Sequence, residues 1–117
     1  MEVSEELQAK IAHFQQLQQQ VQYVAAQRIQ LTAQMKETER ALEELGKQKE
    51  GTVYRSIGSL LVKVEDLAGL KKELEDQKEA MEIRIRTMER QEKHLREQYQ
   101  EMQSSLEKEL GAAGQAG

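Results

Sequence analysis

The chain has 117 residues, a net charge of -4 and an isoelectric point near 5.3, which gives no reason to expect nucleic acid as a partner. It has no cysteine, tryptophan or proline, 3% aromatic residues and 32% charged residues, a composition typical of long helices and coiled coils rather than of a compact globular core. No apolar run approaches the roughly 18–20 residues of a membrane span, and the N-terminus lacks the pattern of a signal peptide. We therefore expect a cytoplasmic protein with a single domain over residues 1–117.

A first helix is predicted from about residue 4 to 45. Ser4 is suited to cap its N-terminus, and acidic residues follow in the first turn. No glycine or proline interrupts this stretch, and apolar residues recur with heptad spacing throughout it, which indicates a coiled coil. The polar residues at the a and d positions of this heptad are Lys10, Arg28 and Thr38.

A β-hairpin is predicted over residues 52–65 (TVYRSIGSLLVKVE), where the apolar pattern changes to period two and β-branched residues are frequent. Gly58-Ser59 forms a two-residue loop with glycine first, which suits a type II′ turn. This loop sets the register and collects five apolar side chains on one face, interrupted by Arg55. The five are Val53, Ile57, Leu60, Val62 and Val64.

This hairpin cannot be stable alone, because a two-stranded ribbon is at best marginal in water and both edges carry unpaired backbone groups. Nothing else in the chain has the pattern of a strand, so pairing partners must come from other chains. The five apolar side chains also need cover. We interpret the hairpin as an oligomerisation element.

A second helix is predicted from about residue 66 to 110, with Asp66 as its N-cap. Residues 111–117 (GAAGQAG) have nothing to bury and are predicted to form a flexible tail. The seam of the helix repeats every seventh residue, at Leu67, Leu74, Met81, Met88, Leu95 and Met102.

Two seamed helices joined by a short hairpin are expected to fold back as an antiparallel coiled coil. The fold class predicted is therefore mainly α, with one β-hairpin between two long helices. In the expected alignment Arg28 lies opposite Met88, with its stem packed and its charge reaching solvent. The same alignment pairs apolar residues along the seam, for example Phe14 with Met102 and Leu17 with Tyr99.

No catalytic or metal site is predicted. The two histidines, His13 and His94, are expected about 12 Å apart along the coiled coil, too far to share a metal ion. The predicted fold also brings no serine, histidine and acid together. We therefore expect no enzyme activity and no cofactor.

Binding remains, and the free ends of the two helices are the candidate surface. Apolar side chains beside the seam are expected to stay partly exposed, because two helices cover only their facing sides. Helix ends also fray, which can open the seam, and methionine suits a surface that accepts many partners. The candidate residues are Leu7, Ile11, Phe14, Leu17, Tyr99, Met102, Leu106 and Leu110, with Val3 beside them.

The order of long helix, single hairpin and long helix resembles the β-class subunits of the prefoldin family. The resemblance covers nearly the whole chain and is clearest in four stretches. These are FQQLQQQ at 14–20, ALEEL at 41–45, VYRSIGSLLVKV at 53–64 and MERQEKHLREQYQEM at 88–102.

The resemblance implies a heterohexamer of two α and four β subunits, in which the hairpins join intersubunit β-barrels. It implies that unfolded proteins are captured at the tips of the coiled coils without ATP, kept from aggregating and passed to a group II chaperonin. The five apolar hairpin residues would then serve assembly, and the eight residues at the free ends would hold clients. A structural scaffold or tether that binds one folded partner is the alternative interpretation.

Overall fold

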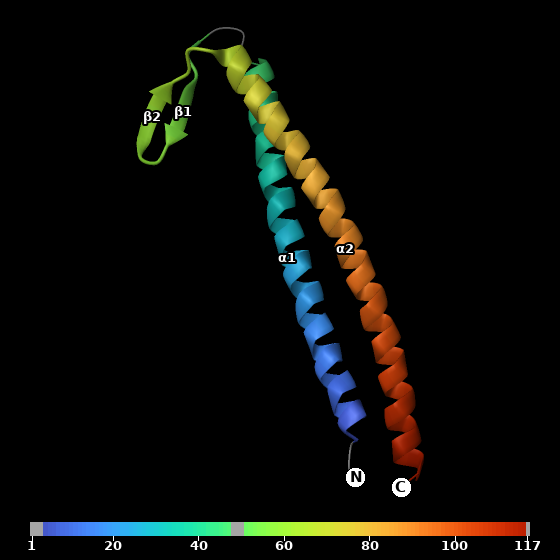
Figure 1. The fold of residues 1–117 in the computed structure, drawn as a ribbon. Coiled ribbons are helices and arrows are strands. Elements are labelled where there is room, and N and C mark those ends of the chain that lie inside the picture. The colour runs from blue at the N-terminus through green and yellow to red at the C-terminus, as the bar shows by residue number, and fades with distance from the viewer. Residues whose placement is uncertain (1–3, 48–50, 117) are drawn as a thin grey trace. The chain divides into compact units, whose positions relative to one another are not determined.

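The computed structural model describes residues 4–47 and 51–116, and the surroundings of side chains as far as residue 112. In chain order the elements are α1 (Glu5–Lys47), β1 (Tyr54–Ile57), β2 (Leu60–Lys63) and α2 (Leu67–Ala116) (Figure 1). The predicted order of helix, hairpin and helix is confirmed. The chain divides into two compact units, a terminal unit of residues 1–29 and 86–117 and a hairpin unit of residues 30–85.

Both helices begin at the caps predicted from the sequence. The hydroxyl Oγ of Ser4 accepts a hydrogen bond of 3.1 Å from the backbone N–H of Leu7. The carboxylate Oδ1 of Asp66 accepts one of 2.9 Å from the N–H of Gly69. Each cap satisfies one of the backbone donors that the first helical turn leaves without a partner.

The helices extend further than predicted. α1 ends at Lys47, two residues beyond the predicted end. α2 continues to Ala116, so the prediction that residues 111–116 lie outside the helix is wrong. Gly111 disfavours a helix by only about 1 kcal/mol relative to alanine, and the alanines around it are strong helix formers. No proline follows to force an end.

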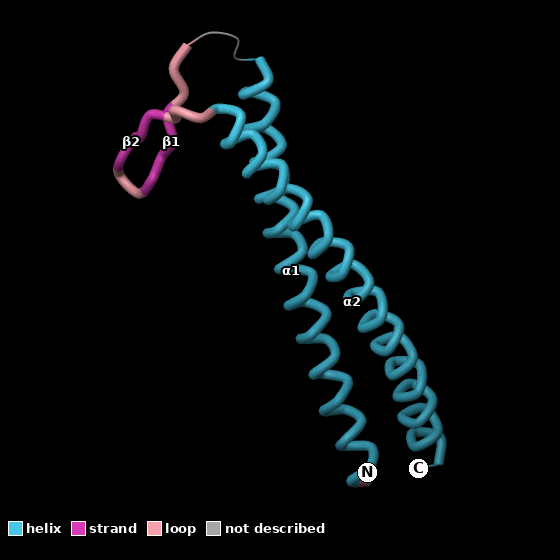
Figure 2. The backbone as a smooth tube through the Cα atoms, turned by 45° about the horizontal axis from the view of Figure 1, so that its top comes forward, coloured by secondary structure: helices cyan, strands magenta, loops and turns pink. Residues whose placement is uncertain are grey.

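Figure 2 shows the two strands of the hairpin side by side. Their register is the predicted one, with Arg55 opposite Val62 and Ile57 opposite Leu60. Gly58 has a φ of 58°, whereas Ser59 does not have a positive φ. Positive φ at the first loop position alone is the mark of a type II′ turn. The turn chemistry therefore fixes which hairpin side chains share a face.

The heptad positions form the core of each unit, as the sequence predicts. In the terminal unit α1 and α2 run antiparallel, and the start of α1 and the end of α2 lie at the same end (Figure 1). The buried apolar side chains of this unit are Leu7, Leu17, Val24 and Leu106. Those of the hairpin unit are Leu31, Leu45 and Ile85.

Neither α1 nor α2 has a stretch that is both long and apolar enough to cross a membrane.

Candidate functional site

The hairpin exposes apolar side chains on both faces. On the predicted face, Ile57, Leu60 and Val62 are exposed, and Val53 and Val64 are half-buried. On the opposite face Tyr54 is also exposed, and Leu61 is 73% exposed. Exposed apolar side chains packed this densely on one small ribbon are typical of an interaction surface.

Arg55 ties the hairpin to the helices. It lies in β1 within the apolar face, and its guanidinium donates two hydrogen bonds to the carboxylate of Glu73 in α2, at 3.0 and 2.9 Å. These bonds hold the pKa of Glu73 below its ordinary value and raise that of Arg55. A two-bond arginine–carboxylate pair fixes orientation as well as distance, so it orients β1 against α2.

A hollow in the hairpin unit lies beside this ion pair. One wall is formed by Val53, Tyr54 and Ser56 at the start of the hairpin, and the other by side chains of α1 and α2. The helical wall is mostly apolar and consists of Ala41, Leu45, Leu70 and Leu74, with Glu44. Together with the exposed hairpin face, this hollow extends the uncovered apolar surface of the unit.

The eight candidate residues at the free ends all lie in the terminal unit, at different depths. Leu17 is 2% exposed, and Leu7 and Leu106 are also buried. The expected partial exposure of Leu106 is therefore wrong, because it packs in the seam. Leu110 is 42% exposed. The remaining four are half-buried, namely Ile11, Phe14, Tyr99 and Met102. Val3 lies outside the described residues.

The two aromatic residues of this group stack on each other. The ring centroids of Phe14 and Tyr99 are 4.6 Å apart, with an angle of 20° between the ring planes. The helix pairing predicted from the sequence sets Phe14 beside Met102 instead, which lies about one helical turn from Tyr99 along α2. Near the same end, Lys10 forms an ion pair with Glu109 across the two helices. The free end is thus held closed by stacking, packing and one ion pair.

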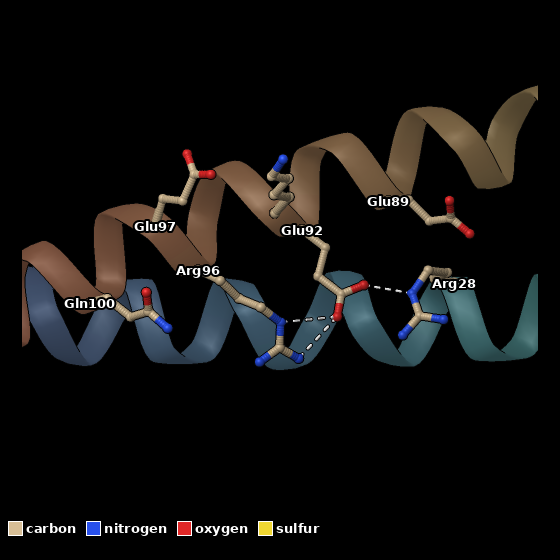
Figure 3. A pocket seen from close by; sticks show the side chains of 7 residues that line it. Arg28, Glu89, Glu92, Arg96, Glu97 and Gln100 are labelled. Carbon is tan, nitrogen blue, oxygen red and sulfur yellow. Dashed lines mark hydrogen bonds and ion pairs between the residues drawn. The ribbon is translucent and has the colours of Figure 1, made fainter.

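A charged cluster within the terminal unit was not predicted (Figure 3). The expected position of Arg28 opposite Met88 is wrong, because its Nε donates a hydrogen bond of 2.5 Å to Oε2 of Glu92. The side chain of Arg28 is still 29% exposed. The other oxygen, Oε1, accepts bonds of 3.2 and 2.9 Å from Arg96. Glu92 is 7% exposed. The signal for this pair was present, since both residues are polar at seam positions of their helices.

The electrostatics of the cluster follow from these bonds. The hydrogen bond from Arg28 is the main cause that lowers the pKa of Glu92, and burial of the carboxylate opposes it. The same bond raises the pKa of Arg28. The cluster therefore keeps its charges at neutral pH.

No candidate metal site was found in the parts of the chain that the structure describes, where no group of three or more histidine, cysteine, aspartate or glutamate side chains could hold an ion. His13 and His94 both have exposed side chains.

A family model described as prefoldin subunit matches residues 8–113. The chain belongs to the prefoldin subunit family. The predicted resemblance to prefoldin β subunits is thereby confirmed, and a chaperone-type role comes with the family.

Individual relatives agree with this assignment. The prefoldin subunit is 47% identical over 107 residues to the prefoldin subunit beta of Archaeoglobus fulgidus, covering 91% of each chain. It is 44% identical over 105 residues to that of Thermoplasma volcanium, covering 89% of this chain and 85% of the relative. The crystal structure of the prefoldin beta subunit from Thermococcus strain KS-1 matches with a TM-score of 0.79 and 29% identity. That match covers 93% of this chain and 96% of the other.

Proposed function

We propose that this prefoldin subunit is part of an ATP-independent chaperone that captures unfolded proteins at the free ends of its two helices. It prevents their aggregation and delivers them to a group II chaperonin. The hairpin joins an intersubunit β-barrel in a heterohexamer of two α and four β subunits. The protein acts in the cytoplasm and has no catalytic step.

The observation that carries the assembly part of this proposal is the uncovered hairpin. Ile57, Leu60 and Val62 expose apolar side chains on a ribbon whose two edges have no partner strand among the described residues. Burying an aliphatic side chain of this size contributes about 1.5–3 kcal/mol. Several such side chains per subunit give a strong driving force for association with other hairpins.

The client-binding part rests on the free end of the terminal unit. Leu110 is exposed there, and the half-buried Ile11, Phe14 and Tyr99 lie close to the end of the seam. Helix ends open more readily than helix centres, so local opening can present these side chains to a non-native chain. Each contact is weak, and several linked subunits add their contacts by multivalency. Weak individual contacts also allow release without nucleotide.

The test is light scattering from a chemically unfolded protein that is diluted into buffer without nucleotide. This subunit is assembled with a two-hairpin α-type prefoldin subunit, and the mass of the complex is confirmed by native mass spectrometry. Suppressed aggregation of several unrelated proteins supports the proposal. An intact complex that leaves aggregation unchanged contradicts it and favours a scaffold for one folded partner.

Two matched variants locate the client surface. Leu110→Ser removes an exposed leucine at the free end, and Ile29→Ser removes an exposed isoleucine of α1 in the same unit but away from that end. Neither side chain belongs to the core, so both variants should keep the mass and melting temperature of the complex. Only Leu110→Ser should reduce the suppression of aggregation. Equal effects of the two changes would contradict the assignment to the free end.

A further inference from the structure

The ion pair between Arg28 and Glu92 has a setting that distinguishes it from the other ion pairs of the chain. Arg28 is the only aspartate, glutamate, lysine or arginine in the 25 residues from Ile11 to Met35. Glu92 is the only buried charged side chain among the residues whose burial the structure describes. The single charge of a long uncharged helical segment therefore meets the single buried charge of the opposite helix.

The rest of the seam does not define the alignment of the helices well. The apolar residues of α2 repeat every seventh residue, and those of α1 follow the same heptad. A shift of one helix by one heptad therefore sets apolar residues against apolar residues again. A regular heptad repeat leaves such shifted registers close in energy, and an isolated polar group in the seam is a known means of separating them.

A shift by one heptad separates Arg28 from Glu92, although it sets the apolar residues against each other again. A shift by one heptad in one direction brings Arg28 to the level of Ile85 and Glu92 to that of Val21. A shift in the other direction brings them to the levels of Tyr99 and Met35. Both shifts would leave a buried carboxylate and a guanidinium against apolar side chains, which is strongly unfavourable.

The connection between the helices does not prevent a shift. Residues 48–66 lie between the end of α1 and the start of α2, and one heptad corresponds to about 10 Å along a helix. Because Arg55 and Glu73 join the hairpin to α2, the displacement would have to come from the six residues between Lys47 and β1, which can reach about 20 Å when extended.

We propose that Arg28 and Glu92 select the helix register of the terminal unit, with Arg96 holding the carboxylate of Glu92 in place. The pair excludes alignments shifted by one heptad and so keeps Leu17 beside Met102 and Leu7 level with the end of α2. Its consequence for client capture rests on the proposed function, because a shifted register would separate the side chains of the free end. Arg28 and Glu92 are positioning residues and do not contact the client.

Because the chain has no cysteine, pairs of introduced cysteines report the register directly. Leu17→Cys with Met102→Cys reports the observed register, since these two residues line the same hollow between the helices. Leu17→Cys with Leu95→Cys and Val24→Cys with Met102→Cys report the two registers shifted by one heptad. Each pair is introduced into the full chain, oxidised, and quantified as intramolecular disulfide by mass spectrometry.

The cysteine pairs are also introduced into the double variant Arg28→Leu/Glu92→Leu, which removes the two charges and leaves apolar side chains in the seam. We expect its melting temperature to equal or exceed that of the parent, because well-packed apolar residues often replace a buried ion pair without loss of stability. The disulfides of the shifted registers should nevertheless rise by about tenfold or more over the parent. A leucine variant that forms only the disulfide of the observed register would overturn the proposal.

A charge-reversed variant separates register selection from loss of stability. Arg28→Glu, Glu92→Arg and Arg96→Glu together restore the three-residue cluster with opposite signs. This variant should form only the disulfide of the observed register, although its sequence differs at all three positions. Shifted disulfides in this variant would contradict the proposal.

If the double leucine variant loses its helical circular dichroism signal, the single variant Arg28→Glu is used in its place. This change sets the carboxylates of residues 28 and 92 against each other. Shifted disulfides in that variant support the proposal, and their absence overturns it. The disulfide assay does not depend on client binding. A failure of the proposed function would therefore leave its result intact, and the two failures are distinguishable.

Discussion

The guanidinium of Arg55 in β1 is held by both carboxylate oxygens of Glu73 in α2, at 2.9 and 3.0 Å. Arg55 is the residue that interrupts the apolar face of the hairpin. The interruption has a structural reason, because the charge reaches back to the helix and directs the ribbon. The pair links the surface proposed for assembly to the helix that continues into the terminal unit.

Removal of this link should weaken assembly and leave the helices intact. In the Arg55→Ala variant the oligomer is expected to dissociate at higher protein concentrations than in the parent. The reason is that the hairpin is no longer held in one orientation before it meets its partners. Native mass spectrometry over a dilution series measures the effect. Lys78→Ala is the matched control, since it removes an ion pair with Glu39 in the same unit that does not involve the hairpin. Equal loss of assembly in both variants would contradict the role of Arg55.

The two faces of the hairpin should differ in importance. Ile57→Asp with Val62→Asp places charges on the face predicted to be buried in the oligomer, and we expect complete loss of assembly. Leu61→Asp places a charge on the opposite face of β2, at a side chain that is 73% exposed, and should cost much less. Circular dichroism should show normal helix content in both variants. Loss of assembly in the Leu61 variant alone would reverse the assignment of the faces.

At the N-cap of α2, the effect of Gly69→Ala on the free energy of unfolding should change sign when Asp66 is removed. Asp66→Ala removes the bond to the N–H of Gly69 and should cost about 1 kcal/mol in the free energy of unfolding. Gly69→Ala should also destabilise the protein, because the added Cβ would lie 2.4 Å from Oδ2 of Asp66. In the Asp66→Ala background the same glycine change should stabilise it by roughly 0.5–1 kcal/mol through helix propensity. A double-mutant cycle from urea unfolding measures the coupling, and additive effects would contradict the geometry.

The pH dependence of stability should reveal Glu92. Its pKa is lowered in the folded protein, mainly by the hydrogen bond from Arg28, so its stabilisation is present above the ordinary glutamate pKa of about 4.3. That stabilisation is lost as the pH falls through the lowered folded-state pKa. Glu92→Gln should destabilise the protein by about 1–3 kcal/mol at pH 7.

Urea unfolding of the parent and the Glu92→Gln variant at several pH values measures this difference. The difference should shrink as the pH falls below about 4.3, because the glutamate of the unfolded chain takes up a proton there while the folded protein keeps Glu92 charged. Comparing the two proteins at each pH cancels the contribution of the other carboxylates. A difference that stayed constant down to pH 3 would show that the charge of Glu92 does not contribute.

Local chemistry made much of this fold predictable from the sequence. Gly58-Ser59 defined the turn and hence the register of the strands, and Ser4 and Asp66 marked the starts of the helices. The heptad repeat placed Leu17 and Val24 in the seam without knowledge of the partner helix. Each of these features depends on residues that are near in the sequence, so a single chain is sufficient to identify it.

Features that depend on the exact alignment of the two helices could not be predicted in the same way. Arg28 was recognised as a polar seam residue, but its partner depends on a displacement of about one turn, which the apolar repeat does not define. The contact of Phe14 with Tyr99 rather than Met102 lies in the opposite direction along α2, so it depends on how the two side chains lean and not on that displacement. The end of α2 was missed for a different reason, because the weak penalty of Gly111 was overcome by neighbouring alanines.

We propose that the free ends of the helices hold unfolded proteins. The most direct measurement is photo-cross-linking in the assembled complex, with a photoreactive amino acid placed at Leu110 or, as control, at Ile29. Both side chains are exposed, so neither replacement disturbs the core. We predict that an unfolded client is cross-linked from position 110 at several-fold higher yield than from position 29, in the absence of nucleotide. Equal yields from the two positions, or no client product from position 110, would contradict the account.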